Sequence, residues 1–272
     1  SKGGAGGLGG INGATLNILG NDIRGVSDFL IYTGSYLKFH ADLDVDAEIK
    51  AKTPIAGVLE IKANVTFNNK IGLHNNNTIS NIMLDDGKNI VLKHNAKIND
   101  VLLDNNSKII FDPVARSLNS RIGIAVNSLL LQNDKEGIIE VRGYNAMHPA
   151  AAHAVVFDGV IGTNDVRAKR LNIDAGAGNV TFNEIVHVKN IEVGARTVIF
   201  DEAVHTAIDD GLGKVGRNYM INDLGTMNFD GSNVTFGHKS LSTNRILLRN
   251  NARVTFDAPL DHPVRIIAHG AG

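Results

Sequence analysis

Two segments of the chain share one pattern: VLLDNNSKIIFD spans residues 101–112 and ILLRNNARVTFD spans residues 246–257, aligned without a gap. In each segment an apolar run leads into an Asn-Asn pair, and a second apolar run follows. Asn tolerates the left-handed backbone conformation and hydrogen-bonds its own backbone, which is typical of a tight turn. The pattern therefore predicts a strand–turn–strand unit that recurs along the chain.

The same unit also recurs at closer spacing. The segment ISNIMLD at residues 79–85 has its counterpart in INDVLLD at residues 98–104, and the apolar runs after them, 90–92 and 109–111, match at the same offset. Self-similarity at a period of about twenty-odd residues is the signature of a solenoid, in which each turn is one structural repeat.

Phenylalanine marks the second strand of the unit. Seven of the ten phenylalanines follow a β-branched residue by two positions, as in Val65-Thr66-Phe67-Asn68, and an eighth, Phe229, follows Met227 in the same way. All eight precede a polar or turn-forming residue. Side chains alternate faces along a strand, so Val65 and Phe67 share one face and Thr66 points the other way. In a stack of coils, each inward Val and Phe would pack on its equivalents one turn away, which buries a face that one turn could not bury alone.

These observations predict an all-β fold, a β-solenoid. Residues 1–54 open on a glycine-rich stretch and are expected to form an N-terminal segment or cap, because ordered glycine loses the most backbone entropy. Residues 55–272 are expected to form the β-helix body. The repeat is interrupted near 113–152 and 203–218, which we expect to be loop insertions on one flank.

The composition excludes several classes of protein. With 27 basic and 28 acidic residues the formal net charge is -1, which argues against a nucleic-acid partner, because phosphate binding needs a basic surface. The chain has no cysteine, which excludes disulfides and thiolate metal sites. No apolar run approaches the ~18 residues of a spanning helix, so no membrane insertion is expected.

No motif predicts a catalytic, cofactor-binding or metal-binding residue. The spelling GxGxxG at Gly211–Gly216 lacks the strand before it and the βαβ pattern around it that a dinucleotide site requires. Aspartates recur after predicted strands, and turn chemistry accounts for such recurrence, whereas a catalytic pair would be a local exception to the repeat. These aspartates are Asp85, Asp104, Asp112, Asp158, Asp201, Asp230 and Asp257. We therefore expect no cofactor, no metal and no enzymatic activity.

The Asn-Val-Thr-Phe-Asn type of repeat resembles the passenger region of rickettsial-type outer-membrane autotransporters, the surface cell antigens. The segments that carry the resemblance are Asn64–Asn68, His153–Gly159, Gly178–Asn183 and Ala252–Asp257. The resemblance implies a right-handed parallel β-helix that is exported across the outer membrane and displayed on the bacterial cell surface. It also implies adhesion to host cells, with a host-cell surface protein or glycan as the partner.

Two other functions remain open from the sequence. The first is a β-helix polysaccharide lyase or hydrolase, which would require a cleft with two or more acids that depart from the repeat. The second is a purely structural stalk or surface-layer component. The ends of a solenoid are open sheet edges, so self-association is a further expected interaction.

Overall fold

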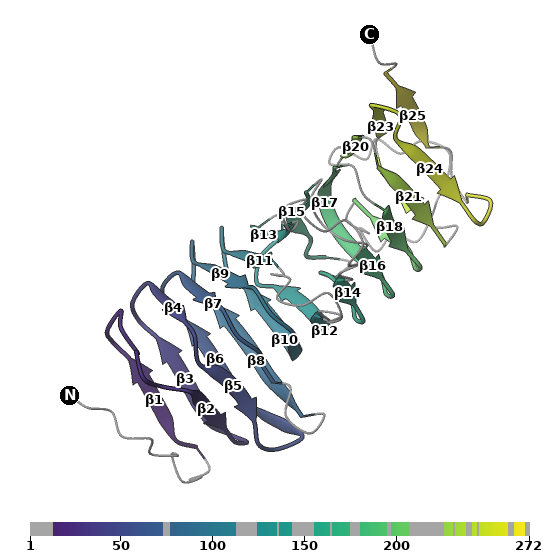
Figure 1. Ribbon diagram of the computed structural model, residues 1–272. Coiled ribbons are helices and arrows are strands. Elements are labelled where there is room, and N and C mark those ends of the chain that lie inside the picture. Colours follow the sequence, from purple (N-terminus) through teal and green to yellow (C-terminus); the bar gives the residue numbers. More distant parts are fainter. Residues whose placement is uncertain are drawn as a thin grey trace, which may run out of the picture.

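Every strand pair among the described residues of the computed structural model is parallel, and the strands stack into a β-solenoid (Figure 1). The all-β solenoid predicted from the repeats is confirmed. The structure describes residues 13–72, 77–112, 124–134, 136–142, 155–163, 165–174, 180–194, 197–206, 226–230, 232–237, 241–243, 245–260 and 264–269.

One face of the solenoid is an 11-stranded sheet. Its strands, in spatial order, are β1 (Thr15–Ile18), β3 (Tyr36–Phe39), β6 (Ile55–Ile61), β8 (Thr78–Leu84), β10 (Ala96–Leu103), β12 (Ile124–Leu131), β14 (Val155–Phe157), β16 (Val180–Phe182), β18 (Thr197–Phe200), β21 (Asn233–Phe236) and β24 (Arg253–Phe256). The spatial order follows the sequence order, as expected when each turn of a coil lies on the previous one.

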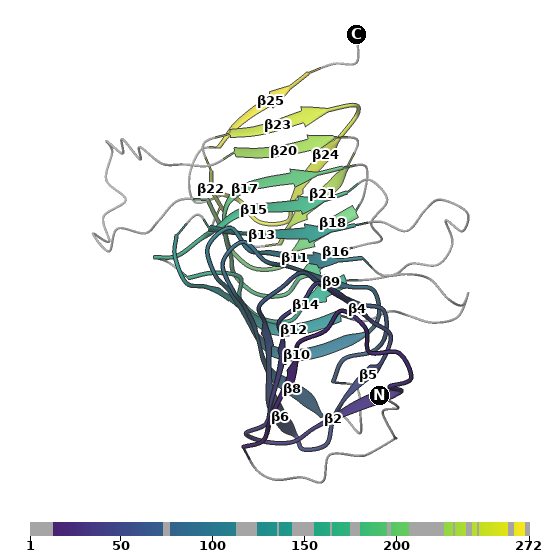
Figure 2. The same ribbon diagram turned by 90° about the vertical axis from the view of Figure 1, so that its left-hand side faces the viewer.

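A 12-stranded sheet forms a second face, and its strands stack like rungs (Figure 2). Its main path contains β4 (Leu43–Val45), β7 (Val65–Phe67), β9 (Asn89–Leu92), β11 (Lys108–Phe111), β13 (Glu136–Val141), β15 (Ala168–Ile173), β17 (Val186–Val193), β20 (Thr226–Asp230), β23 (Arg245–Arg249) and β25 (Arg265–Ala268). Beside this path β19 (Val204–His205) pairs with β17 and with β22 (Leu241–Ser242), and β2 (Asp28–Ile31) pairs separately with β5 (Glu48–Ala51).

The inward Phe of the repeat forms the core stack that the sequence predicts. The rings of Phe157 and Phe182 lie 4.7 Å apart and almost parallel, those of Phe182 and Phe200 lie 4.8 Å apart, and Phe236 continues the stack at 5.3 Å. All four side chains are at most 2% exposed. Thr181, between the inward Val180 and Phe182, faces outward as predicted.

The turns follow the predicted asparagine chemistry. Asn106, Asn250 and Asn251 have φ values of 53°, 49° and 61°, in the left-handed region that Asn tolerates better than most residues. The two copies of the repeat unit have the same strand–turn–strand structure but occupy the two sheets in opposite order. The unit at 101–112 passes from β10 in the 11-stranded sheet to β11 in the other sheet, whereas the unit at 246–257 passes from β23 in the 12-stranded sheet to β24.

The stacked strands begin before residue 55, where the β-helix body was predicted to start. β1, β3 and β4 lie within residues 15–45 and belong to the same two sheets as the rest of the chain. The strand YLKF at Tyr36–Phe39 has the same inward alternation as later strands, with Leu37 and Phe39 fully buried. Residues 1–12 lie outside the described residues.

Strands lie within both ranges in which the sequence predicts loop insertions. Residues 124–131 form β12 and 136–141 form β13, both inside the range 113–152, and β19 lies inside 203–218. These strands lack the Phe motif but keep the alternation, because Leu129 and Ile139 pair in register with buried residues of the previous turn. Residues 113–123, 135, 143–152 and 207–218 of these ranges lie outside the described residues.

The Phe stack makes a direct stability prediction. Replacing Phe182 by Asp puts an unpaired charge into the stack and removes two ring contacts, so we expect the free energy of unfolding to fall by about 3–5 kcal/mol. The matched control is Thr181→Asp, one residue away on the outward face, which we expect to cost less than about 1 kcal/mol. Thermal unfolding followed by circular dichroism measures both, and equal melting of the two variants would contradict the inward stack.

Candidate functional site

The outer face of the 12-stranded sheet carries a column of polar side chains that is continuous over four strands. Glu140 pairs in register with Asn172, Asn172 with Glu192, and Glu192 with Asn228. Since adjacent strands lie about 4.8 Å apart, the column offers a hydrogen-bonding group at each step of that length. The four residues come from one strand pattern, an outward polar residue between two inward apolar ones.

A groove of about 420 Å³ runs beside the C-terminal part of this column, along β15, β17 and β20. Its lining residues are Asn172, Ile173, Asp174, Glu192, Val193, Gly194, Asn228 and Arg249. Gly194 follows β17, donates its backbone N–H to the Ile173 carbonyl oxygen at 2.8 Å, and lines the groove. We call Glu140, Arg142, Asn172, Asp174, Glu192 and Asn228 the polar flank.

The charges of the polar flank are coupled. The Glu140 carboxylate accepts a hydrogen bond from Arg142 Nε at 2.6 Å and lies 3.2 Å from Lys108 Nζ. Burial raises the pKa of Glu140, but the hydrogen bonds from Arg142 and Lys108 outweigh burial, so that its pKa is lowered overall. The pKa of Asp174 is raised, first by burial and then by the negative charge of Glu140.

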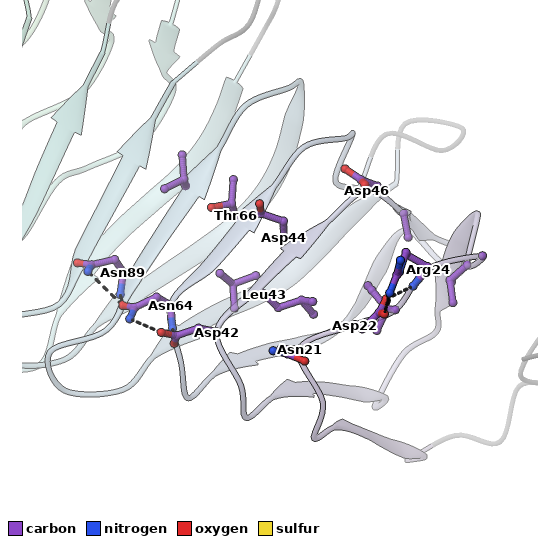
Figure 3. Close-up of a pocket in the computed structure, with 16 residues that line it drawn as sticks. Asn21, Asp22, Arg24, Asp42, Leu43, Asp44, Asp46, Asn64, Thr66 and Asn89 are labelled. Atoms are coloured by element: carbon purple, nitrogen blue, oxygen red, sulfur yellow. Dashed lines mark hydrogen bonds and ion pairs between the residues drawn. The ribbon is translucent and has the colours of Figure 1, made fainter. Parts of the chain in front are cut away.

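A second and larger groove, of about 840 Å³, lies at the N-terminal end of the same sheet, beside β4 (Figure 3). Here Asn64 donates its backbone N–H to Asp42 Oδ1 at 2.7 Å, and Asn89 donates its backbone N–H to Asn64 Oδ1 at 3.1 Å. The hydrogen bond from Asn64 lowers the pKa of Asp42. Asp22 bonds Arg24 across an exposed loop, which lowers the pKa of Asp22 to about 2.

A buried ion pair ties three turns together on the side of the solenoid. Arg167 is fully buried, and its Nε and Nη2 lie 3.0 and 3.2 Å from the two carboxylate oxygens of Asp134. Its Nη1 donates to the carbonyl oxygen of Thr206 at 2.5 Å. A buried charge is tolerated only when it is paired and hydrogen-bonded in this way, so the contact fixes the entry to β15.

Next to this ion pair His187 is held in the neutral state. His187 is 5% exposed, and its ring stacks on that of His205 with the centroids 5.2 Å apart. Burial, followed by the positive charges of His205 and Arg167, lowers the pKa of His187 to about 4. Gly162 permits this close packing, since its φ is +69° and an added Cβ would lie 2.8 Å from the His187 carbonyl oxygen.

Of the recurrent aspartates, Asp104 bonds within its own turn, whereas Asp158 and Asp85 contact residues of an adjacent turn, Asp85 at 3.6 Å from Lys62 Nζ. Asp104 accepts the backbone N–H of Asn105 at 2.7 Å, and Asp158 accepts a bond from the Asn183 amide at 2.8 Å. The GxGxxG spelling at Gly211–Gly216 lies outside the described residues. Within the described ranges, no cluster of three or more His, Cys, Asp or Glu is arranged to hold a metal ion. Among the same residues, no helix is long and apolar enough to cross a membrane.

The polar flank and the Arg167–Asp134 pair were not predicted from the sequence. A signal for the flank is present, because the triplets IEV, LNI, IEV and MNF at 139–141, 171–173, 191–193 and 227–229 share one pattern. The ion pair has no such signal, since its partners are 33 residues apart and neither belongs to a repeat.

The lowered pKa of His187 predicts acid lability. In the unfolded chain His titrates near 6.5, so the unfolded state binds an extra proton between pH 6.5 and 4, and the folded state loses stability as the pH falls through that window. We expect this residue to contribute a loss of about 3 kcal/mol. Replacing His187 by Phe keeps a ring against His205 and removes the proton site, so urea unfolding should depend less on pH in the variant than in the wild type. If the free energy of unfolding changes by the same amount between about pH 7 and pH 4 in the variant and in the wild type, the assignment of His187 is wrong.

Comparison of the chain with protein-family models, with curated proteins and with solved structures finds no match.

Proposed function

We propose that the chain is a binding module displayed on the bacterial cell surface, that it acts in adhesion to host cells, and that the polar flank is its contact surface. The observation that carries the proposal is the column Glu140, Asn172, Glu192 and Asn228 with its neighbouring groove. Export and surface display rest on the resemblance of the Val-x-Phe repeats to the surface cell antigens.

The geometry of the flank suits an extended polar ligand. Carboxylate and amide groups alternate along the column, and the Arg142 guanidinium lies beside it, which provides both acceptors and donors. A rigid parallel sheet holds these groups at a fixed spacing, so little side-chain and backbone freedom is lost on binding. A glycan chain or an extended peptide, each with a regular series of hydrogen-bonding groups, fits such a surface, and we propose one of these on the host cell as the partner.

Binding to intact mammalian cells tests the proposal. We expect saturable binding of the purified chain, and we expect the double variant Asp174→Asn, Glu192→Gln to weaken it about tenfold or more, because both acceptors line the groove. The control is Thr181→Lys, Thr235→Lys, which changes the net charge by the same amount on the outward side of the 11-stranded sheet. Absence of saturable binding, or an equal loss in both double variants, would contradict the role of the flank.

One observation favours a polysaccharide-cleaving enzyme as the second candidate. Asp174 has a raised pKa and lies beside Glu140 and in the same groove as Glu192, and carboxyls with separated pKa values are what acid–base cleavage of a glycosidic bond requires. The purified chain, assayed on a panel of polysaccharides for new reducing or unsaturated ends, tests this. Cleavage that is lost in Asp174→Asn would replace adhesion by catalysis as the function of the flank.

A further inference from the structure

A second outward column of the 12-stranded sheet carries charges of alternating sign. Its members directly follow the ends of four successive strands, and the backbone N–H of each donates to a carbonyl oxygen of the strand before it. In order along the stack they are Lys93, Asp112, Arg142 and Asp174. Arg142 interacts electrostatically with both Asp112 and Asp174, so each charge has an opposite charge one strand away. We call these four residues the charge column.

The alternation stops at Gly194. Val193 pairs with Ile173, and Gly194 donates its backbone N–H to the Ile173 carbonyl oxygen at 2.8 Å, which places Gly194 one strand beyond Asp174 in the charge column. The alternation predicts a positive charge at this position, and glycine has no side chain that could supply one. Asp174 therefore has a cationic neighbour on one side only.

That neighbour, Arg142, is already bonded to another carboxylate, since its Nε donates to Glu140 at 2.6 Å. Asp174 accepts no hydrogen bond within the described part of the chain. Burial and then the negative charge of Glu140 raise the pKa of Asp174, although Arg142 opposes them. The Asp174 carboxylate thus lacks the donors that would stabilise its charged form.

Two amide oxygens of the same groove also lack a donor. The Oδ1 atoms of Asn172 and Asn228 are buried and accept no hydrogen bond, and both residues line the groove together with Asp174, Glu192 and Gly194. Buried acceptors in folded proteins are satisfied in the great majority of cases, so an unsatisfied pair in one groove requires an explanation. A ligand that brings several donors to the groove provides one.

The Glu192 carboxylate is only loosely paired. Its cationic contact among the described residues is Arg170 Nε at 3.9 Å, well beyond the distance of a charge-assisted hydrogen bond, and both side chains are more than two-fifths exposed. Glu192 is therefore able to accept a closer donor from a ligand in the groove.

The one arginine that lines the groove, Arg249, lies farther from the gap than Asp174 does. Phe229 pairs with both Val193 and Leu248, so Arg249 follows two strands beyond Gly194. With strands about 4.8 Å apart, a charge at the gap is roughly 5 Å from the position of Asp174 and roughly 10 Å from that of Arg249. Since the interaction falls with distance and is screened by salt, the attraction of Asp174 exceeds the repulsion of Arg249.

We propose that the groove binds an arginine side chain of an extended peptide, and that the guanidinium enters the gap at Gly194, where it donates to Asp174, Glu192 and the neighbouring amide oxygens. A guanidinium has five donors in one plane and no acceptor, which suits a groove whose acceptors lack donors. Sugar hydroxyls both donate and accept, and guanidinium groups occur in peptides. The inference rests on the proposed function, because it names the ligand class of the same polar flank.

An NMR titration with two short peptides tests the ligand class. The probes are the blocked peptide Thr-Thr-Arg-Thr-Thr and the same peptide with citrulline in place of arginine, which keeps the shape and removes the charge. We expect the arginine peptide to bind at least about tenfold more tightly, and to shift the backbone amide signals of Asp174 and Gly194. Equal affinity of the two peptides, or shifts confined to other residues, would overturn the proposal.

The variant Gly194→Arg places the guanidinium of the chain itself in the gap, so we expect it to weaken binding of the arginine peptide at least about tenfold. Thr181→Arg adds the same charge on the outward face of the 11-stranded sheet and should leave the affinity unchanged. Gly194→Ala keeps the gap uncharged and should retain binding. Circular dichroism establishes that each variant is folded.

If the Gly194→Arg chain is destabilised, Asp174→Asn provides the test with Gly194 in place. It removes the nearest carboxylate and should bring the affinity for the arginine peptide close to that for the citrulline peptide. Unchanged affinity in Asp174→Asn, or an equal loss in Thr181→Arg and Gly194→Arg, would show that the guanidinium does not bind at the gap.

Competition on mammalian cells separates this inference from the proposed function. We expect the arginine peptide to displace the bound chain and the citrulline peptide to leave it in place. Cell binding that depends on the polar flank but is displaced by a chitosan oligomer and not by the arginine peptide overturns the peptide ligand and leaves adhesion standing. An arginine peptide that binds the groove of a chain that does not bind cells supports the ligand class and contradicts adhesion.

Discussion

The fold depends on the contact between like residues of successive turns. An inward Val or Phe on one strand packs on its equivalent one strand away, and the parallel backbone ladder keeps the two in register. Neither the ladder nor the apolar stack can exist in a single turn, so each turn is stable only because its neighbours are present. The register of the inward side chains also sets the register of the outward side chains, because the two alternate along each strand.

The repeated motifs were sufficient to predict the class of fold. The Val-x-Phe pattern identified the inward residues, and the Asn-Asn pairs identified turns that enter the left-handed region. Phe229 and Phe236 are only seven residues apart, and the structure places them on two successive strands, β20 and β21, which lie in different sheets. What the motifs could not show is which face a given unit occupies, because an inward Val or Phe satisfies either sheet equally well.

The extent of the stacked region was harder to predict for a related reason. Strands such as β12 and β13 use Leu and Ile instead of Phe, and a buried position needs only an apolar side chain of suitable volume. The polar flank was missed because each of its residues is an ordinary outward position in its own strand, and becomes part of a site only when four turns are in register. The ion pair between Arg167 and Asp134 depends on the path of the chain between turns, which no local pattern records.

The stacking of turns along one axis also has a mechanical consequence. The strands lie across the long axis, so the ladder hydrogen bonds between turns point along it (Figure 2). Tension applied between β1 and β25 is carried by every junction in series, so the molecule yields first at its weakest junction. Since each turn contacts only its neighbours, a turn that has been pulled away can re-form on the intact remainder when the load is released. A solenoid of this kind behaves under load as an extensible tether that absorbs force in small, reversible steps.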